Sequence, residues 1–192
     1  MSKNPIKISN IKIGVKIKTI SARALKNLCE ESNVKYKDVG NFIVFQLTDE
    51  KNEFKYTYSI FGPRSKKQAK VHTNICGLKE GQIEKSIKRL EIFLNHPHEN
   101  TSYEVNTVTG TVKLGHKINL RHFLQSNLLD SANEIKFIPE AFPALYLTRD
   151  KITYSIFSTG CVNIVGAKSR EAIESNIEYI TQKCLESAST NT

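Results

Sequence analysis

The sequence predicts an α+β fold built from two tandem repeats of similar design. Three observations predict it: a pentapeptide that occurs twice, short runs with the alternation of β-strands, and one amphipathic helix closing each copy. The pentapeptide Thr-Tyr-Ser-Ile-Phe stands at 57–61 and again at 153–157. Because chance identity of this length is improbable in 192 residues, we divide the chain into copies at 5–97 and 98–186.

Other segments extend the match between the copies. The run 12–17 resembles 113–118, and Gly77-Leu-Lys resembles Gly166-Ala-Lys. The spacing between matched residues shortens along the chain, so the first copy is the longer one, chiefly at 48–53 and 62–68. Both segments have the polar or Gly-Pro composition of surface turns, where insertions are tolerated.

Each copy has the same expected order of elements. An alternating strand opens it, at 11–17 and more loosely at 108–118. A short helix follows, at 21–28 and 119–128, with Ser21 or Asn119 able to cap its start. Short strands come next, at 42–47, 54–61 and 70–76 in the first copy and at 142–148, 151–157 and 161–165 in the second.

The closing helices carry their apolar residues on one stripe. These residues are Ile83, Ile87, Leu90 and Leu94 in the first copy and Ile173, Ile177, Ile180 and Cys184 in the second. One stripe covers one face of a sheet, so the opposite face has no cover. In the strand 42–47, Ile43, Phe45 and Leu47 form the better core set. If the helices cover that set, four phenylalanines project from an open face: Phe42, Phe61, Phe142 and Phe157.

The charge balance favours an anionic partner. The 28 Lys and Arg residues exceed the 19 Asp and Glu residues, which gives a net charge of +9 and favours nucleic acid or an acidic membrane surface. All apolar runs are far shorter than the roughly 20 residues that span a bilayer. The first 20 residues lack the apolar core of a secretory signal. We therefore expect an intracellular protein without a membrane span.

No motif indicates catalysis, a cofactor or a metal. Phosphate-binding loops, dinucleotide fingerprints and nucleophile elbows are absent from the sequence. The four cysteines are widely spaced and are expected to be reduced thiols. His96 and His98 alone would make an incomplete metal site in a loop. We expect a protein that is not an enzyme.

The second copy resembles the core of the TATA-box-binding protein family. Three segments occur in that family's order and near its spacing: Glu140-Ala-Phe-Pro143, Ile156-Phe-Ser-Thr-Gly160 and Gly166-Ala-Lys-Ser-Arg-Glu171. The first copy keeps Phe42, Ile60-Phe61 and Cys76-Gly-Leu-Lys79, so the resemblance covers 6–185. It implies a saddle, in which a curved antiparallel sheet has helices on its convex side and meets the minor groove of DNA on its concave side.

The resemblance also implies roles for single residues. Phe42, Phe61, Phe142 and Phe157 match the phenylalanines that wedge between base steps in this family, the standard example of minor-groove kinking. The expected minor-groove face comprises Asn10, Val44, Cys76, Asn106, Asn163 and Val165. The expected phosphate contacts are Lys79, Arg149, Lys151 and Lys168. Pro139 and Glu140 match a loop that holds a transcription factor IIB-like partner.

The sequence therefore predicts a general transcription initiation factor that binds and bends A·T-rich promoter DNA. Its expected partners are double-stranded DNA, a transcription factor IIB-like protein and the RNA polymerase machinery, in the nucleus or at a viral transcription site. One alternative is a degenerate protein-interaction module of a transcription complex with little DNA binding. Another is a hydrophobic-ligand carrier whose phenylalanines line a cavity. Four phenylalanines kept on an open face favour DNA over both.

Overall fold

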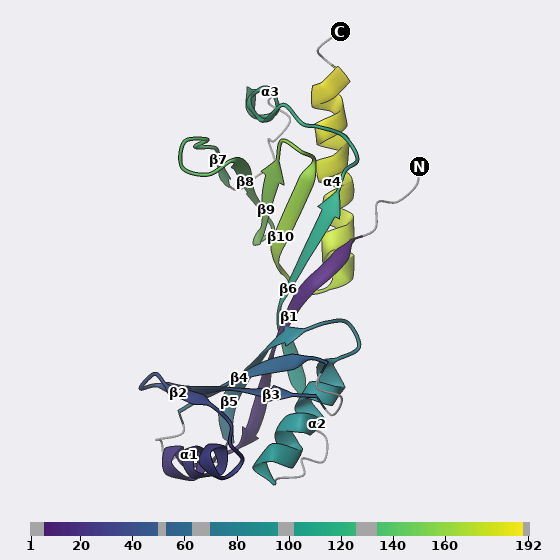
Figure 1. Cartoon of the computed structure of the whole chain (residues 1–192). Coiled ribbons are helices and arrows are strands. Elements are labelled where there is room, and N and C mark those ends of the chain that lie inside the picture. Colours follow the sequence, from purple (N-terminus) through teal and green to yellow (C-terminus); the bar gives the residue numbers. More distant parts are fainter. Residues whose placement is uncertain (1–5, 50–52, 63–69, 96–101, 126–133, 190–192) are drawn as a thin grey trace. The chain divides into compact units, whose positions relative to one another are not determined.

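The computed structural model describes residues 6–49, 53–62, 70–95, 102–125 and 134–189 (Figure 1). Both halves of the chain pass through the same order of elements. The first half comprises β1 (Lys7–Lys18), α1 (Ala22–Glu31), β2 (Tyr36–Asp38), β3 (Phe42–Thr48), β4 (Lys55–Phe61), β5 (Lys70–Leu78) and α2 (Ile83–Leu94). The second comprises β6 (Tyr103–Lys113), α3 (Leu120–Gln125), β7 (Glu134–Lys136), β8 (Ala144–Arg149), β9 (Ile152–Phe157), β10 (Cys161–Ala167) and α4 (Arg170–Ser189).

Contacts group the chain into two compact units. The first unit is Asn10–Asn106, and the second joins the residues up to Ser9 to the chain from Thr107 onward. The start of β1 belongs to the second unit because Ser9 Oγ donates a hydrogen bond of 3.1 Å to the carbonyl of Thr109. Arg170 likewise donates to the carbonyl of Ile6 at 3.4 Å. These units differ from the two sequence repeats, whose boundary is expected at 97–98. The units are defined by contacts in the folded chain, whereas the repeats are defined by sequence similarity.

The first unit contains an antiparallel sheet with strands in the order β2-β3-β4-β5-β1. Helix α2 covers the face that carries Phe45 and Tyr58. The ring of Phe93 on α2 lies 5.2 Å from that of Phe45, and the Tyr58 hydroxyl donates to the carbonyl of Ser86 at 2.8 Å. Arg89 on the same helix donates to the carbonyl of Thr48 at 2.9 Å. The predicted core set of β3 is therefore confirmed.

The second unit contains an antiparallel sheet in the order β6-β10-β9-β8-β7. Helix α4 lies along these strands (Figure 1). All four residues of the predicted stripe on α4 are buried: Ile173, Ile177, Ile180 and Cys184. A Cβ on Gly110 of β6 would lie 3.5 Å from Ile173 Cδ1, which shows how closely this helix approaches the sheet. The helix therefore covers the face that carries the buried strand residues.

The match expected between 12–17 and 113–118 is wrong. In β1, Ile13 pairs with Ile75, and in β6, Gly110 pairs with Ile164. Ile75 and Ile164 occupy equivalent positions, because each stands two residues before a matched Gly-x-Lys segment. Their strand partners, Ile13 and Gly110, are therefore equivalent as well. The sequence match had aligned the interior of β1 with the end of β6 and the loop after it, where similar lysines and an isoleucine recur.

The short helices begin where their caps predict. Ser21 Oγ accepts from the N–H of Ala24 at 3.1 Å, and Asn119 Oδ1 accepts from the N–H of His122 at 3.2 Å. Strand β8 begins at Ala144, two residues later than expected, so Phe142 precedes the strand. The two insertion segments and the two loop histidines lie partly or wholly outside the described residues: 50–52, 63–68, His96 and His98.

Candidate nucleic-acid interface

The open face of each unit is the sheet face opposite the covering helix. In the first unit it carries Phe42, Val44, Gln46, Thr57, Ser59, Phe61, His72, Asn74 and Cys76, all half-buried or exposed. In the second it carries Tyr146, Thr148, Thr153, Ser155, Phe157, Cys161, Asn163 and Val165, again half-buried or exposed. Their sequence neighbours on the same strands are mostly buried, because successive side chains point to opposite faces.

A phenylalanine pair stands on the open face of the first unit. Phe42 and Phe61 are direct partners across β3 and β4, and their ring centroids lie 4.9 Å apart at an interplanar angle of 31°. Both rings are half-buried. The ring of His72 lies beside the pair, with its centroid 6.0 Å from that of Phe61. The pair therefore presents an apolar edge to whatever meets this face.

A second pair stands on the second unit. Phe142 and Phe157 meet edge to face, with ring centroids 5.9 Å apart. Phe142 is 39% exposed although it is a large apolar ring, and it also stacks on Tyr146 at 5.2 Å. The N–H of Phe142 donates to the carbonyl of Ile138 at 3.0 Å, which fixes the turn that carries the ring. The structure thus brings the four predicted phenylalanines together as two pairs, one in each unit.

Small polar side chains occupy the middle of each open face. Ser59 pairs with Asn74 in the first unit, and Ser155 pairs with Asn163 in the second. The outer pairs are Thr57 with Cys76 and Thr153 with Val165. Four of the residues expected on the minor-groove face therefore lie on these open faces: Val44, Cys76, Asn163 and Val165.

The two remaining predicted asparagines have different surroundings. Asn10 Oδ1 accepts a hydrogen bond of 2.8 Å from the N–H of Gly77, so its side chain supports the end of β5. Asn106 Nδ2 donates to Asn74 Oδ1 at 3.2 Å and reaches the open face of the first unit. Sequence reasoning missed Asn74 and His72. Extending the match of the Gly-x-Lys segments three residues upstream would have aligned Asn74 with Asn163.

Two glycines bend the strands that lead to the predicted lysines. Gly77 has φ +88° and Gly166 has φ +102°, both in the left-handed region that favours glycine. The pairing of β10 with β6 shifts register between Ile164 and Ala167, which marks a β-bulge at this point. Lys79 and Lys168 follow these bends, and both side chains are exposed.

The four predicted phosphate contacts are not equivalent. Lys151 is exposed, in the turn that joins β8 to β9, and Lys79 and Lys168 are exposed after their glycines. Arg149 instead lies on the helix-covered face, with its Cζ 4.0 Å from the centroid of the Tyr179 ring on α4. A cation in that position stabilises the contact between helix and sheet. The structure therefore separates Arg149 from the open face.

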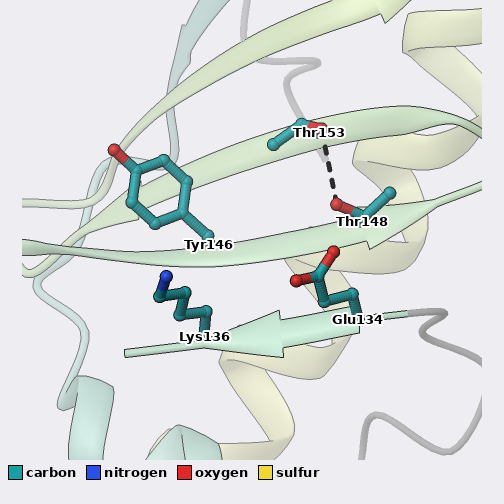
Figure 2. A pocket seen from close by; sticks show the side chains of 5 residues that line it. All are labelled: Glu134, Lys136, Tyr146, Thr148 and Thr153. Carbon is teal, nitrogen blue, oxygen red and sulfur yellow. Dashed lines mark hydrogen bonds between the residues drawn. The ribbon is translucent and has the colours of Figure 1, made fainter. Parts of the chain in front are cut away.

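A small pocket of about 230 Å³ lies at the outer edge of the second open face. Figure 2 shows Glu134 and Lys136 directed from β7 toward Thr148 and Tyr146 on β8. Thr148 Oγ1 and Thr153 Oγ1 lie 3.4 Å apart across β8 and β9. The volume is below the roughly 300–1,000 Å³ of ligand cavities. This pocket is therefore too small to support the hydrophobic-carrier alternative, and it places the carboxylate of Glu134 and the ammonium group of Lys136 at the edge of the second open face.

Residues 102–186 match the family model of "Transcription factor TFIID (or TATA-binding protein, TBP)". This segment, somewhat less than half of the chain, is therefore similar to the TATA-binding protein family. A comparison with curated protein sequences finds no match.

Solved structures extend the likeness to the whole fold. Methanococcus jannaschii TBP superposes with a TM-score of 0.70 at 22% identity, over 94% of this chain and 98% of that one. At this identity the likeness shows the fold, and it confirms the predicted α+β class. The ligand-free regulatory subunit of aspartate kinase from Thermus thermophilus reaches a TM-score of only 0.29 at 10% identity, over 93% of this chain and 95% of that one.

The loop predicted to hold a partner protein is accessible. Pro139 and Glu140 are exposed in the turn between β7 and β8. The N–H of Ala141 donates to the carbonyl of Ile138 at 3.0 Å and closes the turn. This turn carries the Glu-x-Phe-Pro pattern on which the sequence resemblance rests, and it leads directly into Phe142.

Two of the four cysteines, Cys29 and Cys184, are buried. Burial raises the pKa of Cys29 to about 11 and that of Cys184 to about 12. Burial also raises the pKa of Cys76, while nearby Lys12 acts in the opposite direction. Among the described residues no group of three or more His, Cys, Asp or Glu side chains is arranged to hold a metal ion. No helix in the described part of the chain is long and apolar enough to cross a membrane.

Proposed function

We propose that this protein is a sequence-preferring general transcription initiation factor that binds A·T-rich promoter DNA in the minor groove and bends it. The open sheet faces meet the groove, and the phenylalanine pairs enter between base steps. The observation that carries the proposal is the presence of one phenylalanine pair on the open face of each unit.

The pairs have the chemistry that base-step opening needs. An apolar ring between two base pairs unstacks them at a cost of a few kcal/mol, and the bent groove then meets more protein surface. Flexible pyrimidine–purine steps bend at the lowest cost, so sequence preference arises largely from deformability. The pairing of Phe42 with Phe61 and of Phe142 with Phe157 supplies two adjacent rings for each opened step.

The open faces favour A·T over G·C pairs. In the minor groove, A·T pairs present only acceptors, whereas guanine adds an amino group that protrudes into the groove. The middle of each open face carries small side chains that accommodate a smooth groove floor, such as Ser59 and Ser155. A protruding amino group would hold the sheet away from the floor.

Lysines supply the phosphate contacts. The net charge of +9 attracts the duplex, and each lysine that neutralises a phosphate adds to the salt dependence of binding. We assign this role to Lys79, Lys151 and Lys168, whose side chains are exposed near the ends of open-face strands. We do not assign it to Arg149, whose guanidinium lies over Tyr179.

Partner proteins would dock beside the DNA. Pro139 and Glu140 are exposed next to Phe142, so a transcription factor IIB-like protein bound there would sit at the edge of the bent duplex. Such a contact would recruit the RNA polymerase machinery in the nucleus or at a viral transcription site. The protein would act without catalysing a reaction, as expected of a family of non-enzymatic transcription factors.

Binding to matched duplexes tests the proposal. The full chain should bind an A·T-rich duplex more tightly than a G·C-rich duplex of equal length, and a small ligand that fills the minor groove should compete. Failure to bind either duplex would instead favour a protein-interaction module. Equal affinity for both duplexes, with no competition, would indicate nonspecific charge attraction only.

A further inference from the structure

Asn74 lies in the middle of the open face of the first unit, between Ser59 on β4 and Gly14 on β1. Its Oδ1 accepts from Asn106 Nδ2 at 3.2 Å and lies 2.9 Å from His72 Nε2. Because an amide oxygen only accepts, His72 Nε2 must carry the hydrogen. Two donors from different elements therefore fix the orientation of the Asn74 amide.

The fixed orientation leaves the amino group of Asn74 for a ligand. No described residue accepts a hydrogen bond from Asn74 Nδ2, and the side chain is half-buried on the open face. With the oxygen occupied, the side chain offers donors and no ready acceptor to a molecule on this face.

Gly14 makes room for this arrangement. A Cβ on Gly14 would lie 2.7 Å from His72 Cε1 and 3.0 Å from Asn106 Nδ2. A larger residue at position 14 would displace both donors. The backbone of β1 thus approaches closely enough to support the amide network.

The same residue recurs at the equivalent place in the second unit. Asn163 on β10 pairs with Ser155, as Asn74 on β5 pairs with Ser59. Each asparagine stands three residues before a Gly-x-Lys segment. An amide is therefore presented at the same register position of both open faces.

We propose that Asn74 reads base pairs from the minor groove as a hydrogen-bond donor, with His72 and Asn106 as its positioning residues. Its amino group pairs with adenine N3 or thymine O2 and meets a second donor in the amino group of guanine. Asn163 performs the same readout in the second unit. This inference rests on the proposed function and names the residues that set its preference.

The test compares duplexes that differ only by the minor-groove amino group. Adenine is replaced by 2,6-diaminopurine at one pair at a time along a bound A·T-rich site, and the affinity of the full chain is measured by fluorescence anisotropy. The wild-type protein should lose about tenfold in affinity at the step that Asn74 reads. Asn74→Asp replaces the donor by an acceptor, so the loss at that step should disappear or invert.

Asn27→Asp is the matched control, since it makes the same charge change at an exposed position on α1. It should keep the wild-type discrimination at every step. Asn163→Asp should remove discrimination at a different step from Asn74→Asp. His72→Ala and Asn106→Ala should weaken discrimination at the Asn74 step and leave the Asn163 step unchanged, which a general loss of stability would not do.

The outcomes separate the inference from the proposed function. If the wild-type chain binds no duplex, both fail. If it binds A·T-rich DNA without discriminating against the added amino group, or if Asn74→Asp and Asn27→Asp give the same profile, the inference alone is overturned.

Discussion

A Cβ on Gly166 would lie 2.7 Å from the carbonyl oxygen of Lys151. The first unit repeats the relationship with Gly77 and Lys55, where the corresponding distance is 3.1 Å. In both units a glycine in the left-handed region lets the end of its strand, β5 or β10, pass close to the backbone at the start of the neighbouring strand, β4 or β9. These contacts shape the strand ends that precede Lys79 and Lys168.

Gly166→Ala should lower the free energy of unfolding by about 2–4 kcal/mol, because it combines an unfavourable φ with a contact against rigid backbone. Chemical denaturation measures this change. Gly81→Ala is the matched control, since Gly81 has φ +75° with nothing within 4 Å of its Cβ position. That variant should lose only about 1–2 kcal/mol. Equal losses in the two variants would show that the approach to Lys151 costs nothing.

Lys168→Ala should reduce the slope of log affinity against log salt by about one, because one phosphate contact is lost. The measurement is a salt titration of binding to an A·T-rich duplex. Arg149→Ala removes the same charge from the helix-covered face and should leave the slope unchanged. A larger effect of Arg149→Ala than of Lys168→Ala would contradict the assignment of Lys168 to the phosphates.

Glu134→Gln should tighten DNA binding by a few fold, because it removes a carboxylate from the edge of the second open face, where phosphates would approach. The gain should shrink as salt rises, since screening weakens the repulsion. Glu84→Gln on α2, an exposed position away from the open face, is the control and should change affinity little. Weaker binding by Glu134→Gln would indicate that the carboxylate contacts DNA directly or orients Lys136.

Thiol labelling at pH 8 should modify Cys76 and Cys161 and spare Cys29 and Cys184. Cys29 and Cys184 are buried, and burial raises the pKa of Cys29 to about 11 and that of Cys184 to about 12. At pH 8 very little of either side chain is therefore in the reactive thiolate form. Burial also raises the pKa of Cys76, so its labelling should accelerate as pH increases. Saturating A·T-rich DNA should protect Cys76 and Cys161, which lie on the open faces, and mass spectrometry after labelling reads this out. Labelling unchanged by bound DNA would place the duplex elsewhere.

The periodic spacing of apolar residues was enough to predict which faces of the strands and helices are buried. The alternation in β3 and β9 and the stripe of α4 identified the buried face, because apolar residues at fixed spacing define a face whatever lies beyond it. The caps at Ser21 and Asn119 were also visible in the sequence. The duplicated pentapeptide predicted the placement of Phe61 and Phe157 on equivalent strands.

Features that depend on contacts between distant residues could not be predicted from the sequence. Strands β2 and β7 have only three residues each and exist through pairing with β3 and β8, which no local pattern reports. The position of Arg149 depends on Tyr179, which lies 30 residues later on α4. The asparagine network depends on residues from β5 and β6 that meet only in the folded chain.

The bend angle of an A·T-rich duplex, measured by fluorescence transfer between its ends, tests the intercalation proposal most directly. Phe61→Ala and Phe157→Ala should each reduce the bend and weaken binding about tenfold or more, because each leaves one base step without its pair of rings. Phe54→Ala, at an exposed phenylalanine that precedes β4, should bend DNA like the wild type. A doubly substituted Phe61→Ala, Phe157→Ala protein that bends the duplex as strongly as the wild type would contradict the account.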